Sequence, residues 1–380
     1  MAFSRTSNLF AALIFLLTAT ASRGQGFRKV YDIPQSKFND VVETIDGSFF
    51  LAGSSEAQPA WFQLTDHIGN PIWSFGYDLE GAEAVAACQV NDGGFVVLTE
   101  YFNDQGDFKN LVVKISPAGT LQWQTLVTNI NMENGSADIV STSDGGAMLA
   151  GNVRPNLYNQ DVKLQKINAD GSLGWATTLG APNADEFAVR LLADADGGFT
   201  VGGWGTYGAA GGGISDFFLA KTDANGALQW LKSYPKPATQ LAYDLIRTND
   251  GGLALLGESQ QTDPILVTLL KTNAAGTEQW YKQFHPRPKG PGLSPLLLFN
   301  SLAEDHAGRL YIPISLYELD VKTDSSFLAT LNPDGQLDTL KAYKSEDRTL
   351  QIIQTHDNKL ALTGCSGTFF TPIQRAFLSR

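Results

Sequence analysis

The chain has 380 residues with a formal net charge of −12, 38 glycines and only two cysteines. This acidic balance excludes a typical nucleic-acid-binding surface, because contacts to phosphate require clustered Lys and Arg.

Residues 1–21 predict a secretory signal peptide. A single Arg5 precedes an apolar stretch from Leu9 to Leu17, and small residues follow at Thr18–Ala21, where a signal peptidase would cut. The apolar stretch is shorter than the roughly 20 residues of a membrane-spanning helix, and no later segment approaches that length. We therefore expect residues 22–380 to form one exported, monomeric domain without a membrane span, secreted, periplasmic or associated with the cell surface.

A tripeptide, Asp-Gly-Gly, recurs along the chain with a period of about fifty residues. It begins at Asp92, Asp144, Asp196 and Asp250, and Asp46-Gly47-Ser48 precedes them, with steps of 46, 52, 52 and 54 residues. A fixed period indicates repeats of one supersecondary unit. Asp-Gly between apolar runs predicts a hairpin with a two-residue turn, because Gly accepts the positive φ that such a turn needs.

A second signature follows the first in every complete unit. Five glycines are each followed four residues later by a tryptophan, and these pairs are Gly69/Trp73, Gly119/Trp123, Gly171/Trp175, Gly226/Trp230 and Gly276/Trp280. Each unit thus predicts four strands, A to D, with Asp-Gly-Gly between A and B, the second Gly between C and D, and the tryptophan on D. We expect these tryptophans to pack between neighbouring units rather than to stack on a ligand.

A third recurring glycine lies seven residues after the turn aspartate, in predicted strand B. It recurs at Gly53, Gly151, Gly203, Gly257 and Gly364. We expect close backbone approach at these positions.

Two further units have altered turns, with Ala307-Gly308 in the sixth and Asp357-Asn358 in the seventh. The seventh ends on its strand C, and residues 27–34 precede the first strand A as residues 230–237, strand D of the fourth unit, precede the fifth strand A. The sequence therefore predicts an all-β, seven-bladed β-propeller of four-stranded antiparallel blades, in which the N-terminal strand completes the C-terminal blade and leaves no open sheet edge.

The two cysteines, Cys88 and Cys365, fall in blades two and seven, which are not neighbours. We therefore expect two buried thiols rather than a disulfide.

The combined pattern, typified by residues 221–230 (Lys-Thr-Asp-Ala-Asn-Gly-Ala-Leu-Gln-Trp), resembles the repeat of exported bacterial propellers, many of them from Bacteroidetes. It is also similar to the tryptophan-docking repeat of quinoprotein-like propellers, which include pyrroloquinoline quinone dehydrogenases and an outer-membrane assembly scaffold. The resemblance covers the whole predicted mature chain and implies the fold. The dehydrogenases have an adjacent cysteine pair and a calcium-bound quinone; this chain lacks adjacent cysteines, so that activity is not implied.

The B–C and D–A connections of a propeller lie on the face opposite the tight turns, and in this chain they are long and aromatic. The candidate ligand-binding residues on this loop face are Tyr101, Phe102, Phe108, Tyr158, Trp204, Tyr207 and Phe369. Loops over a rigid scaffold often bind ligands, which favours a glycan, peptide or protein partner here. The alternative is that the loops fold back and bury their own aromatic side chains.

A second candidate site follows from the position six residues before each turn aspartate. In blade order this position holds Asp40, Ala86, Asp138, Arg190, Asp244, Ser301 and Gln351, which we call the channel ring. The next two positions are almost entirely apolar, so we expect the ring to meet a water-filled channel. There Asp40, Asp138, Asp244 and Arg190 would suit a cation or an ionic ligand; the alternative is a solvated lining without a ligand.

Signatures of catalysis are scarce. The four histidines are scattered without metal-ligand spacing, and the sequence has no nucleophile elbow or phosphate-binding loop. We therefore predict no resident metal or cofactor and favour a non-catalytic binding or scaffolding propeller. The alternative is an enzyme, such as a carbohydrate-active hydrolase or lyase, with its carboxylates at the channel mouth, since the fold sets their spacing.

Overall fold

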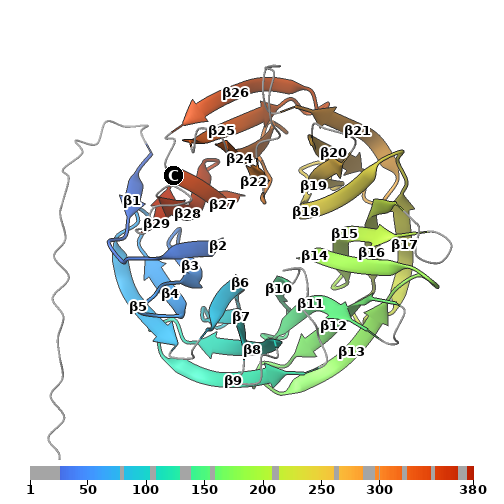
Figure 1. Cartoon of the computed structure of the whole chain (residues 1–380). Coiled ribbons are helices and arrows are strands. Elements are labelled where there is room, and N and C mark those ends of the chain that lie inside the picture. Colours follow the sequence, from blue (N-terminus) through green and yellow to red (C-terminus); the bar gives the residue numbers. More distant parts are fainter. Residues whose placement is uncertain are drawn as a thin grey trace, which may run out of the picture.

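The protein is all-β in a computed structural model that describes residues 26–77, 81–102, 108–128, 138–154, 159–207, 214–260, 265–285, 296–298, 300–318, 323–343, 347–366 and 375–380. Seven antiparallel sheets stand around a central channel as the blades of a propeller (Figure 1). The predicted fold class is confirmed. Residues 1–25, which include the predicted signal peptide, lie outside the described residues.

Blades 1 to 5 each use four consecutive strands in the order A-B-C-D from the channel outward. Blade 1 has β2 (Lys37–Glu43), β3 (Phe49–Ser54), β4 (Ala60–Thr65) and β5 (Pro71–Tyr77). Blade 2 has β6 (Glu83–Gln89), β7 (Phe95–Phe102), β8 (Phe108–Ile115) and β9 (Leu121–Val127). Blade 3 has β10 (Asp138–Ser141), β11 (Ala147–Val153), β12 (Asp161–Ile167) and β13 (Leu173–Leu179).

Blades 4 and 5 repeat this plan, whereas blades 6 and 7 modify it. Blade 4 has β14 (Asp185–Ala193), β15 (Phe199–Thr206), β16 (Ser215–Thr222) and β17 (Leu228–Tyr234). Blade 5 has β18 (Thr239–Arg247), β19 (Leu253–Gln260), β20 (Leu266–Thr272) and β21 (Glu278–Phe284). Blade 6 has β22 (Leu296–Leu298) and β23 (Ala303–Glu304), which both pair with β24 (Leu310–Glu318), then β25 (Thr323–Leu331) and β26 (Leu337–Tyr343). Blade 7 has β27 (Asp347–Gln354), β28 (Leu360–Ser366), β29 (Arg375–Ser379) and β1 (Arg28–Val30).

The N-terminal strand closes the ring as the sequence predicts. β1 pairs antiparallel with β29, and the amide of Arg380 donates to the carbonyl of Phe27 at 2.9 Å. The Tyr31 hydroxyl donates to the Gly69 carbonyl of blade 1 at 2.9 Å, as the hydroxyl of Tyr234, its equivalent on β17, donates to blade 5. The two chain ends therefore replace the C–D turn of blade 7.

The tight turns differ in one detail from the prediction. In each A–B and C–D turn one residue pairs with the residue four positions later, as Thr44 N does with Ser48 O at 2.9 Å, and this leaves three loop residues rather than two. Each is a type I turn whose last residue has a positive φ near 80° at Gly47 and 62° at Asn358, so a G1 bulge follows it. The two-residue expectation was wrong because Asp-Gly also fits this longer turn.

The aspartate of Asp-Gly-Gly holds its own turn. Asp92 Oδ1 accepts from the amide of Gly94 at 2.8 Å and from Lys114 Nζ, at the end of strand C, at 2.9 Å. The same aspartate–lysine pair recurs in blades 3, 4 and 5. Blade 6 has Ala307 at the turn and Thr330 at the lysine position, so both partners are replaced there.

Each tryptophan packs on the next blade. A Cβ placed on Gly119 would lie 2.7 Å from the Trp73 ring, and Trp73 Nε1 donates to the carbonyl of Pro117 at 2.9 Å. The same Gly–Trp contact recurs at each later tryptophan, up to Trp280 on the turn glycine of blade 6. Blade 6 has Thr339 instead of a tryptophan, and the next blade has no C–D turn on which an indole could pack. The five strand-D tryptophans thus belong to the scaffold.

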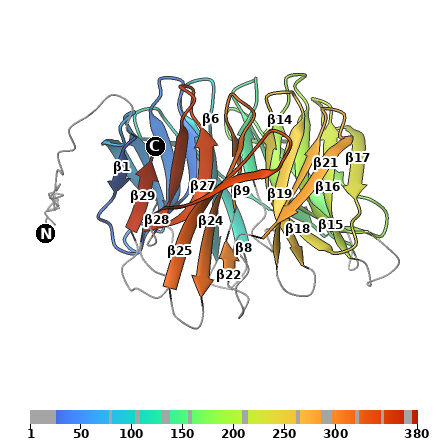
Figure 2. The same cartoon turned by 90° about the horizontal axis from the view of Figure 1, so that it is seen from above.

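The core lies between blades rather than in one centre. Buried clusters join successive sheets, and Phe50 of blade 1 stacks on Phe95 of blade 2 with ring centroids 4.0 Å apart. Cys88 and Cys365 are buried in separate blades and no disulfide joins them. Within the described residues, the structure has no helix long and apolar enough to cross a membrane. The tight turns lie together on one face of the disc (Figure 2), which we call the turn face.

Candidate functional site

A β-bulge directs the channel-ring residues inward. In five blades the A–B register shifts directly before the ring residue, between Phe38 and Asp40 in blade 1 and at the equivalent places in blades 2, 4, 5 and 7. A bulge adds one residue to a strand and re-aims the side chain that follows. Opposite the bulge lies the recurring glycine of strand B; a Cβ on Gly53 would be 2.0 Å from the carbonyl oxygen of Lys37. The predicted close approach is confirmed there.

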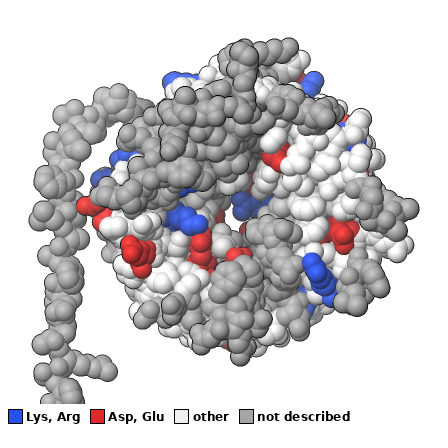
Figure 3. Space-filling view, viewed as in Figure 1, with Lys and Arg blue, Asp and Glu red and all other residues white. Residues whose placement is uncertain are grey.

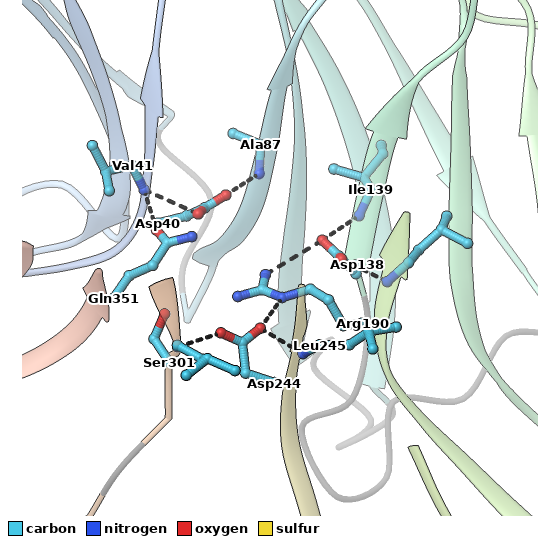
Figure 4. A network of polar contacts seen from close by, with 12 residues as sticks. Asp40, Val41, Ala87, Asp138, Ile139, Arg190, Asp244, Leu245, Ser301 and Gln351 are labelled. Atoms are coloured by element: carbon cyan, nitrogen blue, oxygen red, sulfur yellow. Dashed lines mark hydrogen bonds and ion pairs between the residues drawn. The ribbon is translucent and has the colours of Figure 1, made fainter. Parts of the chain in front are cut away.

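Asp138 shows what the ring aspartates do. Its Oδ1 accepts from the amide of Ile139 in its own blade and its Oδ2 from the amide of Leu191 in the next blade, both at 2.8 Å (Figure 4). These amides belong to the innermost strands, which have no further strand to pair with on the channel side. One carboxylate therefore satisfies the inner edges of two blades.

The same arrangement repeats in alternate blades. Asp40 accepts from Val41 and Ala87, and Asp244 accepts from Leu245 and Leu302. Ser301 Oγ of blade 6 accepts from the amide of Ile352 in blade 7 at 3.1 Å. In every blade, the backbone amide that follows the ring position thus donates to a ring side chain. These amides are those of Val41, Ala87, Ile139, Leu191, Leu245, Leu302 and Ile352. This explains why blade 2 needs only Ala86 at the ring.

Arg190 lies between two of these carboxylates. Its Nε donates to Asp244 Oδ1 at 2.7 Å, and its Nη1 is 3.7 Å from Asp138 Oδ1. The neighbouring carboxylates raise the pKa of Arg190 although burial opposes this. Burial also raises the pKa of Asp138, and it raises that of Asp40 to about 6, while Arg190 lowers both. The ring therefore contains more negative charge than one guanidinium offsets.

The ring is drier than the sequence suggests. Asp40 and Asp138 are 5% exposed and Asp244 is 2% exposed. The oxygens that would coordinate a cation or transfer a proton already accept from amides, and a buried amide left without an acceptor costs about 1–3 kcal/mol. Within the described residues, no group of three His, Cys, Asp or Glu side chains is arranged to hold a metal ion.

A cavity of about 250 Å³ lies directly beside the ring. Blades 4 to 7 line it from the ring residues Arg190, Asp244, Ser301 and Gln351 to Asn249 at the turn face. The turn-side half of the channel is thus a hollow that the sequence did not locate. Figure 3 views the molecule along the channel axis from the opposite, loop face, where basic and acidic atoms surround the central opening.

The loop-face aromatic residues are only partly brought to the surface. Trp204 stacks on its cross-strand partner Phe187 with ring centroids 4.1 Å apart, and Tyr101 and Tyr207 pack at the edges of buried clusters. All three are half-buried. Phe102 and Phe108 pair across the β7–β8 hairpin, whereas Tyr158 and Phe369 lie outside the described residues.

Two groups of carboxyls near the loop face were missed by the sequence analysis. Glu83 and Glu100 face each other across β6 and β7, and Lys37 Nζ lies 2.5 Å from Glu83. Burial raises the pKa of Glu100 to about 7, with a further increase from Glu83 and a decrease from Lys37. These residues lie in strands, and cross-strand spacing around the predicted turn is the signal that would have paired them.

The second group is in blade 4. Glu186 is fully buried, and its Oε1 accepts from the amide of Ala181 at 3.0 Å. Burial raises its pKa to about 7, Asp161 and Asp185 add to the shift, and Ala181 and Tyr207 oppose it. In both groups, a carboxyl near the start of strand A, Glu83 or Glu186, lies among other acidic side chains near the loop face.

The comparisons with known proteins bear on the fold. No protein-family model matches the chain, and no curated protein sequence matches it. The solved structures that it resembles include the polysaccharide lyase Uly1, with 12% identity, 95% of this chain and 93% of that chain covered, and a TM-score of 0.56. An ulvan lyase bound to -[GlcA(1-4)Rha3S]- has 8% identity, with 92% of this chain and 95% of that chain covered, and a TM-score of 0.59.

A third similar structure is BBS1N in its complex with ARL6DN. It has 9% identity, with 93% of this chain and 94% of that chain covered, and a TM-score of 0.51. At such low identity these likenesses show the propeller fold alone, since one propeller can serve an enzyme or a protein–protein complex.

Proposed function

We propose that this protein is a non-catalytic binding or scaffolding propeller that engages a glycan, peptide or protein ligand. The observation that carries the proposal is the use of the channel carboxylates. Asp40, Asp138 and Asp244 are buried and each accepts from two backbone amides. A general acid or base must exchange a proton with substrate, and these groups would have to give up hydrogen bonds of the fold to do so.

The loop face supplies the proposed contact surface. Tyr101, Trp204 and Tyr207 are half-buried, and each packs against neighbouring side chains. Rigid, partly exposed aromatic side chains are typical anchors of binding surfaces. The signal-peptide prediction for residues 1–21 places this surface outside the cytoplasm in our proposal, where an envelope glycan or protein would meet it.

The test is capture of a ligand by the mature protein. A glycan array and a pull-down from native envelope would identify it, and the triple variant Tyr101→Ala, Trp204→Ala and Tyr207→Ala should lose capture at least tenfold. Ile45→Ala, at a 91% exposed position on the turn face, is the matched control and should bind normally. Full capture by the triple variant with an intact melting curve would contradict the loop-face assignment.

A hydrolytic or lyase activity is the second candidate, and a specific pair of residues favours it. Glu83 and Glu100 lie opposite each other, and burial raises the pKa of Glu100 to about 7, so the Glu100 carboxyl can exchange a proton near neutral pH. If incubation with a panel of polysaccharides detects turnover, Glu100→Gln should abolish it while Asp138→Asn should retain it in the folded fraction. Turnover that survives Glu100→Gln would remove this candidate.

A further inference from the structure

The channel cavity is separate from the loop face. Its lining begins at the ring and ends at Asn249, beyond the end of β18 on the turn side. The proposed loop-face surface lies at the opposite ends of the blades. A ligand in this cavity would therefore use other residues than Tyr101, Trp204 and Tyr207.

At the ring end of the cavity, the acceptors of Asp244 and Ser301 are already used, and the arginine side chains keep donors. Both oxygens of Asp244 accept from amides, and Ser301 Oγ accepts from and donates to Ile352. Arg190 uses Nε and Nη1 for the two aspartates, and its other amino group points away from them, toward the side of the channel where Gln351 lies (Figure 4). Arg247 contacts Asp194 through Nη2 and is exposed. Arg190 and Arg247 thus both line the cavity, and each guanidinium has donors beyond those that pair with aspartates.

The surrounding charge disfavours an ionic ligand of either sign. The lining contains two guanidinium groups, on Arg190 and Arg247, and two carboxyl groups, on Asp244 and Glu304, while Asp40 and Asp138 lie beside it. An anion would meet this excess of carboxylates. A cation would need carboxylate oxygens of Asp244 that already accept from amides. A neutral group with several oxygen acceptors fits both constraints.

The remaining wall is aliphatic, and the volume is small. Leu192, Ile246, Ala303 and Ile353 line the cavity between the polar residues. Its 250 Å³ is below the roughly 300–1,000 Å³ of pockets for drug-sized ligands. The C–H groups of a sugar ring can pack on such a wall while its hydroxyl oxygens accept from arginine.

We propose that the turn-side half of the channel binds one neutral sugar unit at the end of a glycan, with Arg190 and Arg247 donating to its oxygens. The site narrows the proposed binding function to a ligand class and rests on it, but it uses a different face of the disc. A neutral monosaccharide is the smallest probe of the idea.

The test uses the mature protein and titrations followed by saturation-transfer NMR and calorimetry. The probes are glucose, galactose, mannose, xylose and rhamnose, with glucuronate and inorganic phosphate as charged comparisons. We expect saturable binding of at least one neutral sugar and at least tenfold weaker binding of both charged probes. A preference for a charged probe, or saturable binding of none of the five sugars, would overturn the proposal.

Two variants locate the binding. Arg247→Gln removes a donor at an exposed position, and Asp194 keeps its contacts with Lys221 and Thr200. Ile353→Phe enlarges a side chain of the aliphatic lining and leaves both arginines in the sequence unchanged. Each variant should weaken sugar binding at least tenfold. The control Arg309→Gln should not weaken it, because Arg309 is exposed and pairs with Asp305 outside the cavity lining. Unchanged binding in both cavity variants overturns the proposal.

The loop-face triple variant separates this proposal from the function proposed above. Retained sugar binding there, with loss in Arg247→Gln, supports the channel site. The reverse pattern overturns the channel site and leaves a binding propeller. Absence of any captured ligand in arrays and pull-downs, with sugar binding intact, would instead overturn the loop-face proposal alone.

Discussion

The inner and outer edges of the blades are joined to neighbouring blades by different chemistry. At the channel, buried carboxylates and one hydroxyl accept from the amides of successive inner strands, as Asp138 does from Ile139 and Leu191. At the rim, indoles pack on turn glycines, as Trp123 does on Gly171, with one hydrogen bond from Trp123 Nε1 to the carbonyl of Ala169. Polar groups thus join the blades where space is narrow, and large apolar rings join them where the blades diverge.

The difference shows how a repeated residue and a varied residue can share a structural role. The tryptophan is the same in five units because every C–D turn offers the same surface. The ring residue varies because one aspartate serves two blades, so that its neighbour is free to be Ala86 or Arg190. Variation at a channel position is therefore weak evidence for a ligand site.

The largest effect is expected from removing the closure strand at the outer edge. Deletion of residues 26–33 takes away β1 and its pairing with β29, as well as the Tyr31 hydrogen bond to blade 1. The deletion leaves β29 as an open strand edge and removes a contact between blades 7 and 1. We therefore expect a lowered melting temperature and aggregation. Circular dichroism and light scattering measure both, against a chain that begins at Gly26. An unchanged melt would show that the ring does not depend on this strand.

Next in size is the loss of one rim tryptophan. Trp123→Ala should lower the free energy of unfolding by about 3 kcal/mol, the lower end of the range for large-to-small core substitutions, because the indole is only partly buried. Chemical denaturation measures this. Thr339→Trp is the control, since no turn faces that position, and it should change stability little. Equal and large effects of both substitutions would contradict the docking account.

A smaller loss is expected at the ring. Asp138→Asn leaves one acceptor for the two amides of Ile139 and Leu191, so the free energy of unfolding should fall by about 1–3 kcal/mol. Chemical denaturation again measures the change. Asp170→Asn, at an exposed turn carboxylate, is the matched control and should be nearly neutral. Stability equal to wild type in the ring variant would mean that its hydrogen bonds contribute nothing net.

A last prediction compares the buried carboxyls with the turn aspartates by their pH dependence. Burial holds the pKa of Asp40 at about 6 and those of Glu100 and Glu186 at about 7, above the value near 4 of an unfolded chain. A raised folded-state pKa gives stability that is complete below pH 4 and lost as pH rises through 6 to 7. The turn aspartates Asp144 and Asp250 have pKa values of about 2, so their contribution is lost only as pH falls from 4 toward 2.

These opposite signs predict a melting temperature that is highest near pH 4–5 and declines toward pH 8. Differential scanning calorimetry across that range measures it. Glu186→Gln should flatten part of the decline because its side chain does not ionise. A melting temperature that rises steadily from pH 5 to 8 would contradict the assignment of buried, proton-holding carboxyls.

The sequence predicts the fold because its strongest signals are local. Asp-Gly-Gly and Gly-x-x-x-Trp mark turns and strands within one blade, and counting them gives seven blades and the closing strand. The site is less accessible because its contacts join residues about fifty positions apart, as between Asp138 and Leu191. The sequence places Asp138 at the channel, but not the amide of the next blade that makes its carboxylate structural.

The same limit applies to the hollow in the channel. Arg190 is predictable as a ring residue, whereas Arg247 at the end of β18 is not, since only the folded structure shows that both arginines line one cavity. Glu83 and Glu100 were missed for a related reason, because they meet only through the register of β6 and β7.

The central claim is that the channel ring serves the fold by accepting from inner-edge amides. Native-state hydrogen exchange of the mature protein, resolved by residue, tests it directly. The relevant amides are those of Val41, Ala87, Ile139, Leu191, Leu245, Leu302 and Ile352. The account predicts slow exchange at all seven, and faster exchange at Ile139 and Leu191 alone in Asp138→Asn. Fast exchange at these amides in the unaltered protein would contradict it.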